Sequence, residues 1–278
     1  MAMQKLVSTS RAANTGMHSD GTFAALPSDD CTFCCWLQFT DDSSVFNTLF
    51  AGDAGQYQVY TGAGTSSRAL IARMDGSNAT VGGSQATQDV WFFYYFHFGL
   101  NHNGTIDVEL FRGSSSQGTV TSSGSSTEMT AAAFKLWLLG DDSVTANTDG
   151  GFVGEIFHPC FFEGIIALAD LPYNSGAAEW EEMSATAAAA CVFELRAETS
   201  DPGLDSSGNG NNFIVESSGV TLSSTDLPPG ANPVGGSTGL LKYWTGSAWS
   251  EKPVKYWNGS AWVTKPVKYW NGSAWVLA

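Results

Sequence analysis

The segment Val90-Trp-Phe-Phe-Tyr-Tyr-Phe-His-Phe-Gly-Leu100 decides the fold class. Aromatic residues favour extended strands, and this segment is too short to cross a membrane as a helix. Its aromatic residues stand at consecutive positions, so we expect both faces of the strand to be covered, as in the middle of a sandwich. The turn Asn101–Gly104 and the alternating segment Thr105–Arg112 follow it, which predicts a hairpin.

Other short strands are predicted on both sides of this hairpin, separated by turns rich in Gly, Asp and Ser. They are Thr32–Phe39, Asn47–Ala51, Gln56–Thr61, Arg68–Met74, Phe134–Leu139, Gly150–Phe157, Cys191–Arg196, Phe213–Val215 and Val220–Leu222. Residues 1–30 alternate weakly, Gly113–Ser126 is typical of a Gly/Ser loop, and Ala177–Ala190 is the one helical stretch. Many short strands without a βαβ rhythm predict an all-β fold, an antiparallel jelly-roll sandwich with one short helix.

The C-terminus repeats one motif three times with a period of 13 residues. Lys242-Tyr-Trp-Thr-Gly-Ser-Ala-Trp249 returns as Lys255-Tyr-Trp-Asn-Gly-Ser-Ala-Trp262 and as Lys268-Tyr-Trp-Asn-Gly-Ser-Ala-Trp275. Asn-Gly is a strong signal for a two-residue hairpin turn, so we expect three tandem hairpins in which Trp257 faces Ser260. The domain boundaries predicted from these patterns are a body at 1–226, a Pro/Gly linker at 227–239 and a repeat arm at 240–278.

The nine aromatic residues of the repeats are the candidate contact residues. They are Tyr243, Trp244, Trp249, Tyr256, Trp257, Trp262, Tyr269, Trp270 and Trp275. Aromatic anchors dominate protein interfaces, so one interpretation is a surface for attachment to other virion proteins or for self-association. A second is a set of shallow platforms for sugar rings or a cation. A third is that the rings only pack the hairpins against one another.

Charge is unevenly distributed along the chain. The formal net charge is −15, but the arm holds five lysines and one glutamate, which leaves −19 on the remainder. An acidic body argues against nucleic acid as its partner. A basic arm is suited to docking on an acidic surface, such as that of a neighbouring copy, although strong net charge also simply keeps proteins soluble.

The five cysteines, 31, 34, 35, 160 and 191, are odd in number and stand in apolar settings. They indicate buried free thiols rather than a disulfide framework, and adjacent Cys34 and Cys35 would point to opposite faces of a strand, which disfavours zinc. The N-terminus lacks the apolar core of a signal peptide, and no segment reaches transmembrane length. We therefore expect synthesis in a reducing cytoplasm and no membrane partner.

The order of motifs resembles the concanavalin A-like, laminin-G-type jelly roll over roughly residues 30–170. The resemblance is carried by the strand containing Trp36, the aromatic strand starting at Trp91, Val108–Gly113, Leu136–Gly140 and Gly151–Ile156. The turn Asp205-Ser-Ser-Gly-Asn-Gly-Asn-Asn212 also resembles a loop of that family, although here it follows the helical stretch. The arm resembles Lys-x-Trp-Asn-Gly-x-x-Trp repeats at the C-termini of tailed-bacteriophage structural proteins, which occur in tail fibres and head decorations.

Catalysis is not expected. The paired-carboxylate strand motif of jelly-roll glycanases is absent, and the acidic cluster Glu179–Glu182 suits a solvated helix face. No other catalytic motif is recognisable, and His97, His102 and His158 are isolated. Calcium is the one possible cofactor, because laminin-G-type domains often hold one ion at a sheet edge. Its candidate ligands are the loop residues Asp141, Asp142, Asp149 and Asp205, although aspartates are also ordinary turn formers.

These features favour a non-enzymatic bacteriophage virion structural protein displayed on the particle surface, either as a head decoration or as a tail-fibre component. In this interpretation the protein is located in the virion, and the arm mediates attachment or oligomerisation. The alternative is a carbohydrate-binding adhesion module that recognises host surface glycans.

Overall fold

The computed structural model divides the chain into two compact units, one spanning Met3–Ala231 and the other containing Asn232–Ala278. The described residues are 4–8, 16–20, 30–40, 47–52, 57–61, 70–74, 77–82, 86–101, 105–122, 136–139, 150–197, 200–215, 220–231, 240–244, 249–253, 255–257, 259–260, 262–264, 268–270 and 275–277. The first unit extends past the body boundary expected at residue 226. Pro229 accepts a hydrogen bond from the backbone of Trp180, and Ala231 is buried.

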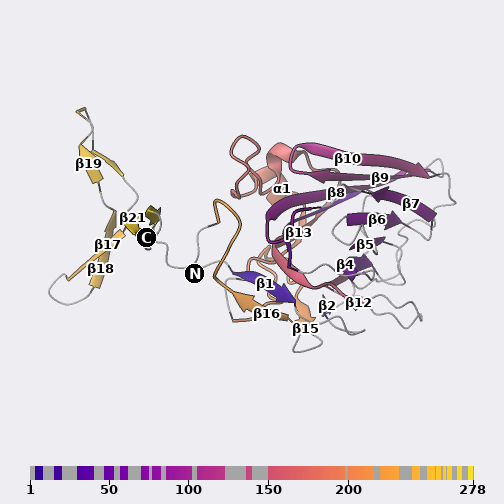
Figure 1. Ribbon diagram of the computed structural model, residues 1–278, viewed down its shortest axis with the longest axis horizontal. Coiled ribbons are helices and arrows are strands. Elements are labelled where there is room, and N and C mark those ends of the chain that lie inside the picture. Colours follow the sequence, from indigo (N-terminus) through magenta and orange to yellow (C-terminus); the bar gives the residue numbers. More distant parts are fainter. Residues whose placement is uncertain are drawn as a thin grey trace. The chain divides into compact units, whose positions relative to one another are not determined.

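The body is a β-sandwich, antiparallel as predicted except for the parallel pair of β12 with β4, and it is built from two eight-stranded sheets (Figure 1). One sheet has the order β10-β9-β8-β3-β13-β1-β16, with β14 paired to β13, and the other has the order β15-β2-β11-β4-β5-β6-β7, with β12 paired to β4. The strands of the first sheet are β1 (Lys5–Ser8), β3 (Cys31–Phe39), β8 (Trp91–Asn101), β9 (Thr105–Arg112), β10 (Ser115–Ser122), β13 (Gly154–Glu163), β14 (Cys191–Glu194) and β16 (Val220–Ser223). Those of the second are β2 (Met17–Ser19), β4 (Asn47–Gly52), β5 (Tyr57–Thr61), β6 (Leu70–Met74), β7 (Ser77–Gly82), β11 (Leu136–Leu138), β12 (Gly150–Gly151) and β15 (Phe213–Val215).

Both faces of β8 are covered, which confirms the prediction from its aromatic sequence. Phe96 and Phe98 point into the core between the two sheets. Phe93 and Tyr95, at the alternate positions, lie in a second core on the other face of the sheet, together with Trp36. This second core is closed by Ile166, Leu171, Tyr173 and Ala187 of the segment 164–190, and by Ala231.

The covering segment contains less helix than the sequence predicted. The predicted helix Ala177–Ala190 is present as α1 (Ala185–Ala190), preceded by a short 3-10 helix, η3 (Leu168–Asp170). Ser184 caps α1, its hydroxyl accepting a hydrogen bond from the Ala187 amide. Ala178 has a φ of +56°, which interrupts any helix there. None of the described helices has the length and apolar character needed to cross a membrane.

The predicted loop Gly113–Ser126 was wrong over most of its length. Ser115–Ser122 forms β10, an edge strand that pairs antiparallel with β9. Small polar residues carry no strand signal, but the free edge of β9 supplies a row of hydrogen-bonding partners. The weakly alternating N-terminal segment likewise contains β1 and β2, each inserted between two other strands.

Three separate two-stranded hairpins form the described part of the arm, as predicted: β17 (Leu240–Trp244) with β18 (Trp249–Pro253), β19 (Lys255–Trp257) with β20 (Trp262–Thr264), and β21 (Lys268–Trp270) with β22 (Trp275–Leu277). The predicted two-residue turn was wrong. Trp257 pairs with Trp262 rather than with Ser260, so four residues connect the strands. Gly259 in this connection has a φ of +103°, which glycine adopts without strain. The wider turn brings the two indoles together, because directly paired side chains on one face interact.

A buried lysine joins the two ends of the body. Lys5 on β1 is 3% exposed, and its Nζ lies 2.5 Å from Oε2 of Glu155 on β13. The same Nζ donates to the carbonyl of Asp226, which also accepts a hydrogen bond from Nε1 of Trp91. The chain after β16 is thereby fixed across β1 and β8.

Replacing Lys5 with Met should lower the free energy of unfolding by about 3 kcal/mol, because Glu155 would be left as an uncompensated charge. The double variant Lys5→Met/Glu155→Gln should lose less than the two single variants added together. Urea unfolding of the full chain measures both, with the exposed-site variant Lys255→Met as a control that should change stability by less than about 0.5 kcal/mol. Strict additivity of the two changes would contradict a coupled ion pair.

Candidate functional site

An exposed tryptophan pair lies on the second hairpin of the arm. Trp257 ends β19 and Trp262 begins β20, and their ring centroids are 5.8 Å apart at an interplanar angle of 60°. Their exposed fractions are 52% and 65%. The rings therefore contact each other through part of their surfaces and leave the remainder open to solvent.

The three hairpins repeat this register. Trp244 pairs with Trp249, and Trp270 pairs with Trp275, in the same way as Trp257 with Trp262. The predicted contact residues Tyr243, Tyr256 and Tyr269 each stand one step out of phase with the tryptophans, opposite Ser250, Val263 and Val276. Adjacent strand positions alternate between faces, so the nine predicted residues divide into a tryptophan set and a tyrosine set.

Among the body residues whose exposure the structure describes, no aromatic side chain is exposed to a comparable degree. The large exposed apolar side chains among these residues are Val90, Ile165, Leu204 and Ile214, all aliphatic. The aromatic residues of β8 are used in the two cores. Among the side chains whose exposure the structure describes, which do not include Tyr57, Tyr60 and Trp137 of the body, the strongly exposed aromatic ones are thus Trp257 and Trp262.

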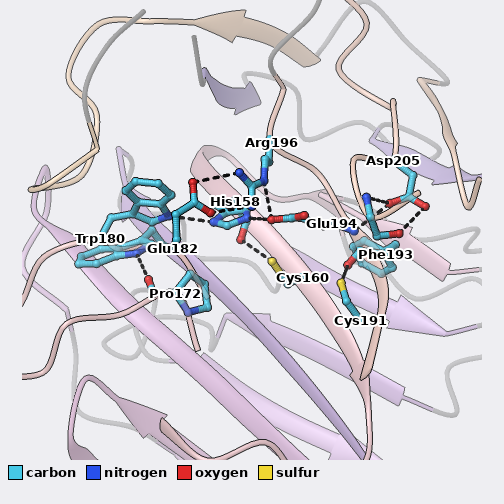
Figure 2. Close-up of polar contacts among 12 residues, drawn as sticks. His158, Cys160, Pro172, Trp180, Glu182, Cys191, Phe193, Glu194, Arg196 and Asp205 are labelled. Carbon is cyan, nitrogen blue, oxygen red and sulfur yellow. Dashed lines mark hydrogen bonds and ion pairs between the residues drawn. The ribbon is translucent and has the colours of Figure 1, made fainter. Parts of the chain in front are cut away.

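A buried polar network joins β13 and β14 to the segment 164–190 (Figure 2). His158 of β13 is 1% exposed, and its Nε2 lies 2.5 Å from Oε1 of Glu194 on β14. Nε1 of Trp180 donates to the other ring nitrogen at 2.9 Å. Arg196 donates from Nε to Glu194 at 2.6 Å and makes two further bonds to Glu182, at 3.0 and 2.7 Å.

The network fixes the tautomer of His158. The indole N–H can only donate, so Nδ1 must accept, and the ring proton lies on Nε2 and is donated to Glu194. Both ring nitrogens are then occupied inside the protein, and this histidine has none left to exchange a proton with a bound molecule. Its φ of +52° lies at the irregularity in the pairing of β13 with β3, which turns the ring toward Trp180.

The same cluster is the one group of potential metal ligands found among the described residues. The ligand atoms of His158, Cys160 and Glu194 all lie within 4.8 Å of one another. The arrangement does not fit a metal well, because Nε2 carries the proton and Arg196 already holds Glu194. Burial raises the pKa of the Cys160 thiol well above its ordinary value, which disfavours the thiolate that a metal requires.

All five cysteines are free and buried, as predicted. Burial raises the pKa of each thiol, and for Cys31 the nearby Asp30 carboxylate adds to the effect. These side chains therefore behave as small apolar residues of the two cores rather than as nucleophiles.

Asp205, one of the four predicted calcium ligands, organises its own loop. One carboxylate oxygen accepts hydrogen bonds from the amides of Glu194 and Ser207, and the other accepts from the Ser207 hydroxyl and the Asn211 amide. Four donors match the acceptor capacity of a carboxylate. Asp141, Asp142 and Asp149 lie outside the described residues, so a calcium site there stays a prediction.

The sequence did not predict the buried network. Glu182 had been assigned to a solvated helix face and His158 considered alone, whereas the structure joins both through Arg196 and Glu194. The one signal in the sequence was Arg196, the only lysine or arginine between Lys135 and Lys242, in a stretch rich in glutamate. Its partners are separated from it in sequence by varied distances, so spacing alone could not identify them.

Comparisons with known proteins show the fold. Neither the scan against protein-family models nor the search of curated proteins finds a match. Among solved structures, the chain is similar to a putative carbohydrate binding protein from Bacteroides ovatus, with a TM-score of 0.55 and 12% identity, over 84% of this chain and 63% of that one. This chain thus spans less than two thirds of that protein's length.

Two more distant likenesses are to a SAP-like pentraxin from Limulus polyphemus and to the CBM40 of a Ruminococcus gnavus sialidase bound to sialyllactose. The pentraxin has a TM-score of 0.46 at 12% identity, over 60% of this chain and 78% of that one. The CBM40 has a TM-score of 0.41 at 11% identity, over 63% and 97%. The Bacteroides likeness agrees with the predicted concanavalin A-like sandwich, while the resemblance of the repeats to bacteriophage proteins stays a prediction.

Acid should weaken the body through Glu194. Burial opposes its ionisation, but the hydrogen bond from His158 and the charge of Arg196 outweigh burial and hold the pKa of this carboxyl below its ordinary value of 4.5. Because the pKa is lower in the folded state, the stabilisation is present above about pH 4.5 and is lost as pH falls through the folded-state pKa.

The variant Glu194→Gln should therefore be less stable than the wild type by about 1.5–3 kcal/mol at pH 7, and the difference should shrink as the pH falls toward 3. Urea unfolding across this pH range measures it. Glu181→Gln, an exposed change in the same segment, serves as the control. A difference that stays constant with pH would show that Glu194 does not contribute through its charge.

Proposed function

We propose that this protein is a non-enzymatic carbohydrate-binding adhesion protein whose arm makes the contact with glycans. The observation that carries the proposal is the exposed Trp257–Trp262 pair, repeated in register in all three hairpins. Exposed aromatic surface is costly in water, and where it is built into a repeated element it marks an interaction site.

A tilted pair of indoles suits a sugar ring. One face of a pyranose presents C–H groups, which pack on an aromatic face, while its hydroxyls remain in water. The 60° angle between the rings offers two faces that a single sugar or two adjacent sugars can contact. Neither ring needs to move out of a packed core for this to occur.

The fold of the body supports the same proposal. The Bacteroides protein that shares the sandwich is described as a putative carbohydrate binding protein. In our proposal the body is the carrier, held rigid by its two aromatic cores, and the arm provides several copies of a weak contact. Several weak sites on one chain give a high combined affinity for a polymeric glycan.

Replacing the six arm tryptophans with Ala in the full chain should abolish binding on an array of bacterial surface glycans. Replacing Trp257 and Trp262 alone removes one of three linked contacts and should weaken binding to a polymeric glycan by about 30-fold, since removing a central Trp typically costs about 2 kcal/mol. Tyr256→Ala is the matched control, because it changes an aromatic residue of the same hairpin out of phase with the tryptophans. Unchanged glycan binding by the six-fold variant would sink the proposal.

We propose as a second function that the protein is a virion structural protein, a head decoration or tail-fibre component, attached or oligomerised through its arm. The resemblance of the repeats to bacteriophage structural proteins supports it, as does the charge of the chain. The arm carries five lysines and one glutamate, whereas the remainder carries a net −19. Tryptophan is enriched at protein interfaces, and a basic arm is attracted to the acidic surface of a neighbouring copy.

Size-exclusion chromatography with light scattering tests this second proposal on the full chain and on a variant lacking 240–278. A defined oligomer for the full chain and a folded monomer for the variant is the expected result. Circular dichroism of the variant controls for loss of the β-sandwich. If the full chain and the variant have the same oligomeric state and enter particles equally well, the arm is not the attachment device.

A further inference from the structure

Each arm hairpin carries a lysine in phase with its tryptophan pair. Lys255 stands two residues before Trp257 on β19, and both side chains are exposed. Positions two apart on a strand share one face. The open face of this hairpin therefore combines two indoles with a solvated positive charge about two residues away, roughly 7 Å along the strand.

The three hairpins differ at the position opposite this lysine. Lys242 pairs with Glu251 in the first hairpin, Lys255 pairs with Thr264 in the second, and Lys268 pairs with Leu277 in the third. Directly paired residues of opposite charge interact across a hairpin. The first lysine is thus placed opposite a carboxylate, while the second and third face neutral residues at the same register position.

We propose that the second and third hairpins bind an anionic saccharide, with a sugar ring on the tryptophan pair and its acidic group on Lys255 or Lys268. The inference rests on the proposed glycan-binding function and names its substrate class. The first hairpin, whose lysine stands opposite Glu251, contributes ring contacts without a preference for charge. The acidic group is a carboxylate or a sulfate, since a flexible ammonium recognises either as a point charge.

The expected preference for an acidic over a neutral polysaccharide is small at each hairpin and larger for the whole chain. An exposed lysine–anion contact changes affinity by about 1.5- to 5-fold. Two such sites acting on one polymer multiply their effects, so we expect roughly a 10-fold preference for an acidic over a neutral polysaccharide. The preference should decline with added salt, because the exposed Lys255 acts in a high dielectric, where salt screens charges effectively.

The test is calorimetric titration of the full chain with polygalacturonate, with dextran sulfate and with neutral dextran. The wild type should bind an acidic polymer about 10-fold more tightly than dextran, and comparison of the two acidic polymers tells carboxylate from sulfate. Lys255→Ala/Lys268→Ala should reduce acidic-polymer binding to the dextran level and leave dextran binding unchanged. The control Lys252→Ala/Lys265→Ala removes the same charge outside the Lys-Tyr-Trp motifs and should keep most of the preference.

A second pair of variants tests the role of the facing position. Thr264→Glu/Leu277→Glu copies the arrangement of the first hairpin and should remove the preference, whereas Glu251→Thr should increase it. Neither change touches a tryptophan, so ring contacts with dextran should persist in both.

Several results would overturn the inference. If Lys252→Ala/Lys265→Ala loses as much as Lys255→Ala/Lys268→Ala, the net charge of the arm alone is responsible, and glycan binding itself still stands. If light scattering shows that Lys255 and Lys268 hold two copies of the chain together, the anion is the acidic body of a second copy. If the wild type binds none of the three polymers, the inference fails outright. The tryptophan variants test a different point. They show whether the arm binds glycans at all, which is the proposed function and not the preference for acidic polymers.

Discussion

The structure depends on a sheet that is buried on both faces. β3, β8 and β13 alternate large apolar side chains toward the other sheet and toward the segment 164–190, so neither face can remain in water. The segment 164–190 must be held against this sheet, and the hydrogen bonds from Trp180 to His158 and from His158 to Glu194 do so. Lys5 and Asp226 fix the returning chain in a similar way. Polar groups are therefore buried in this body chiefly where they hold the cover and the chain ends in place.

This constraint also bears on where the proposed glycan recognition takes place. The aromatic residues of β8, the strongest aromatic strand, are used in packing, and the titratable groups of the network at β13 and β14 are bonded to one another. Both ring nitrogens of His158 are hydrogen-bonded, and Arg196 binds the carboxylate of Glu194, so these groups have a structural role and are not placed for acid–base chemistry. The exposed indoles of Trp257 and Trp262 lie instead on an arm hairpin, where a partner can reach their faces.

The fold could be predicted from the sequence wherever a pattern was local and strong. The β8–β9 hairpin was predicted because its aromatic run and alternation are unambiguous, and the repeats because they are nearly identical. β10 was missed because its strand character comes from the free edge of β9 rather than from its own Ser and Gly residues. The hairpin register was missed because Asn-Gly favours a two-residue turn, whereas the cross-strand contact of Trp257 with Trp262 favours a wider one. The buried network joins residues that only the tertiary fold brings together.

In the proposed glycan-binding function, the marginal stability of each hairpin is coupled to binding. A lone two-stranded hairpin is barely stable in water, and one Trp–Trp contact adds only about 0.5–1.5 kcal/mol. A ligand that packs on both indoles binds the formed hairpin and not the open one, so binding and hairpin formation reinforce each other. Each site then contributes weakly, because part of the contact energy orders the hairpin. Three copies overcome this weakness on a repetitive ligand, and a single copy would not. Weak elements of this kind therefore need to be repeated in near-identical copies. The residues opposite the lysines are the positions at which the hairpins can differ in their preference for charged ligands while keeping the same backbone pairing.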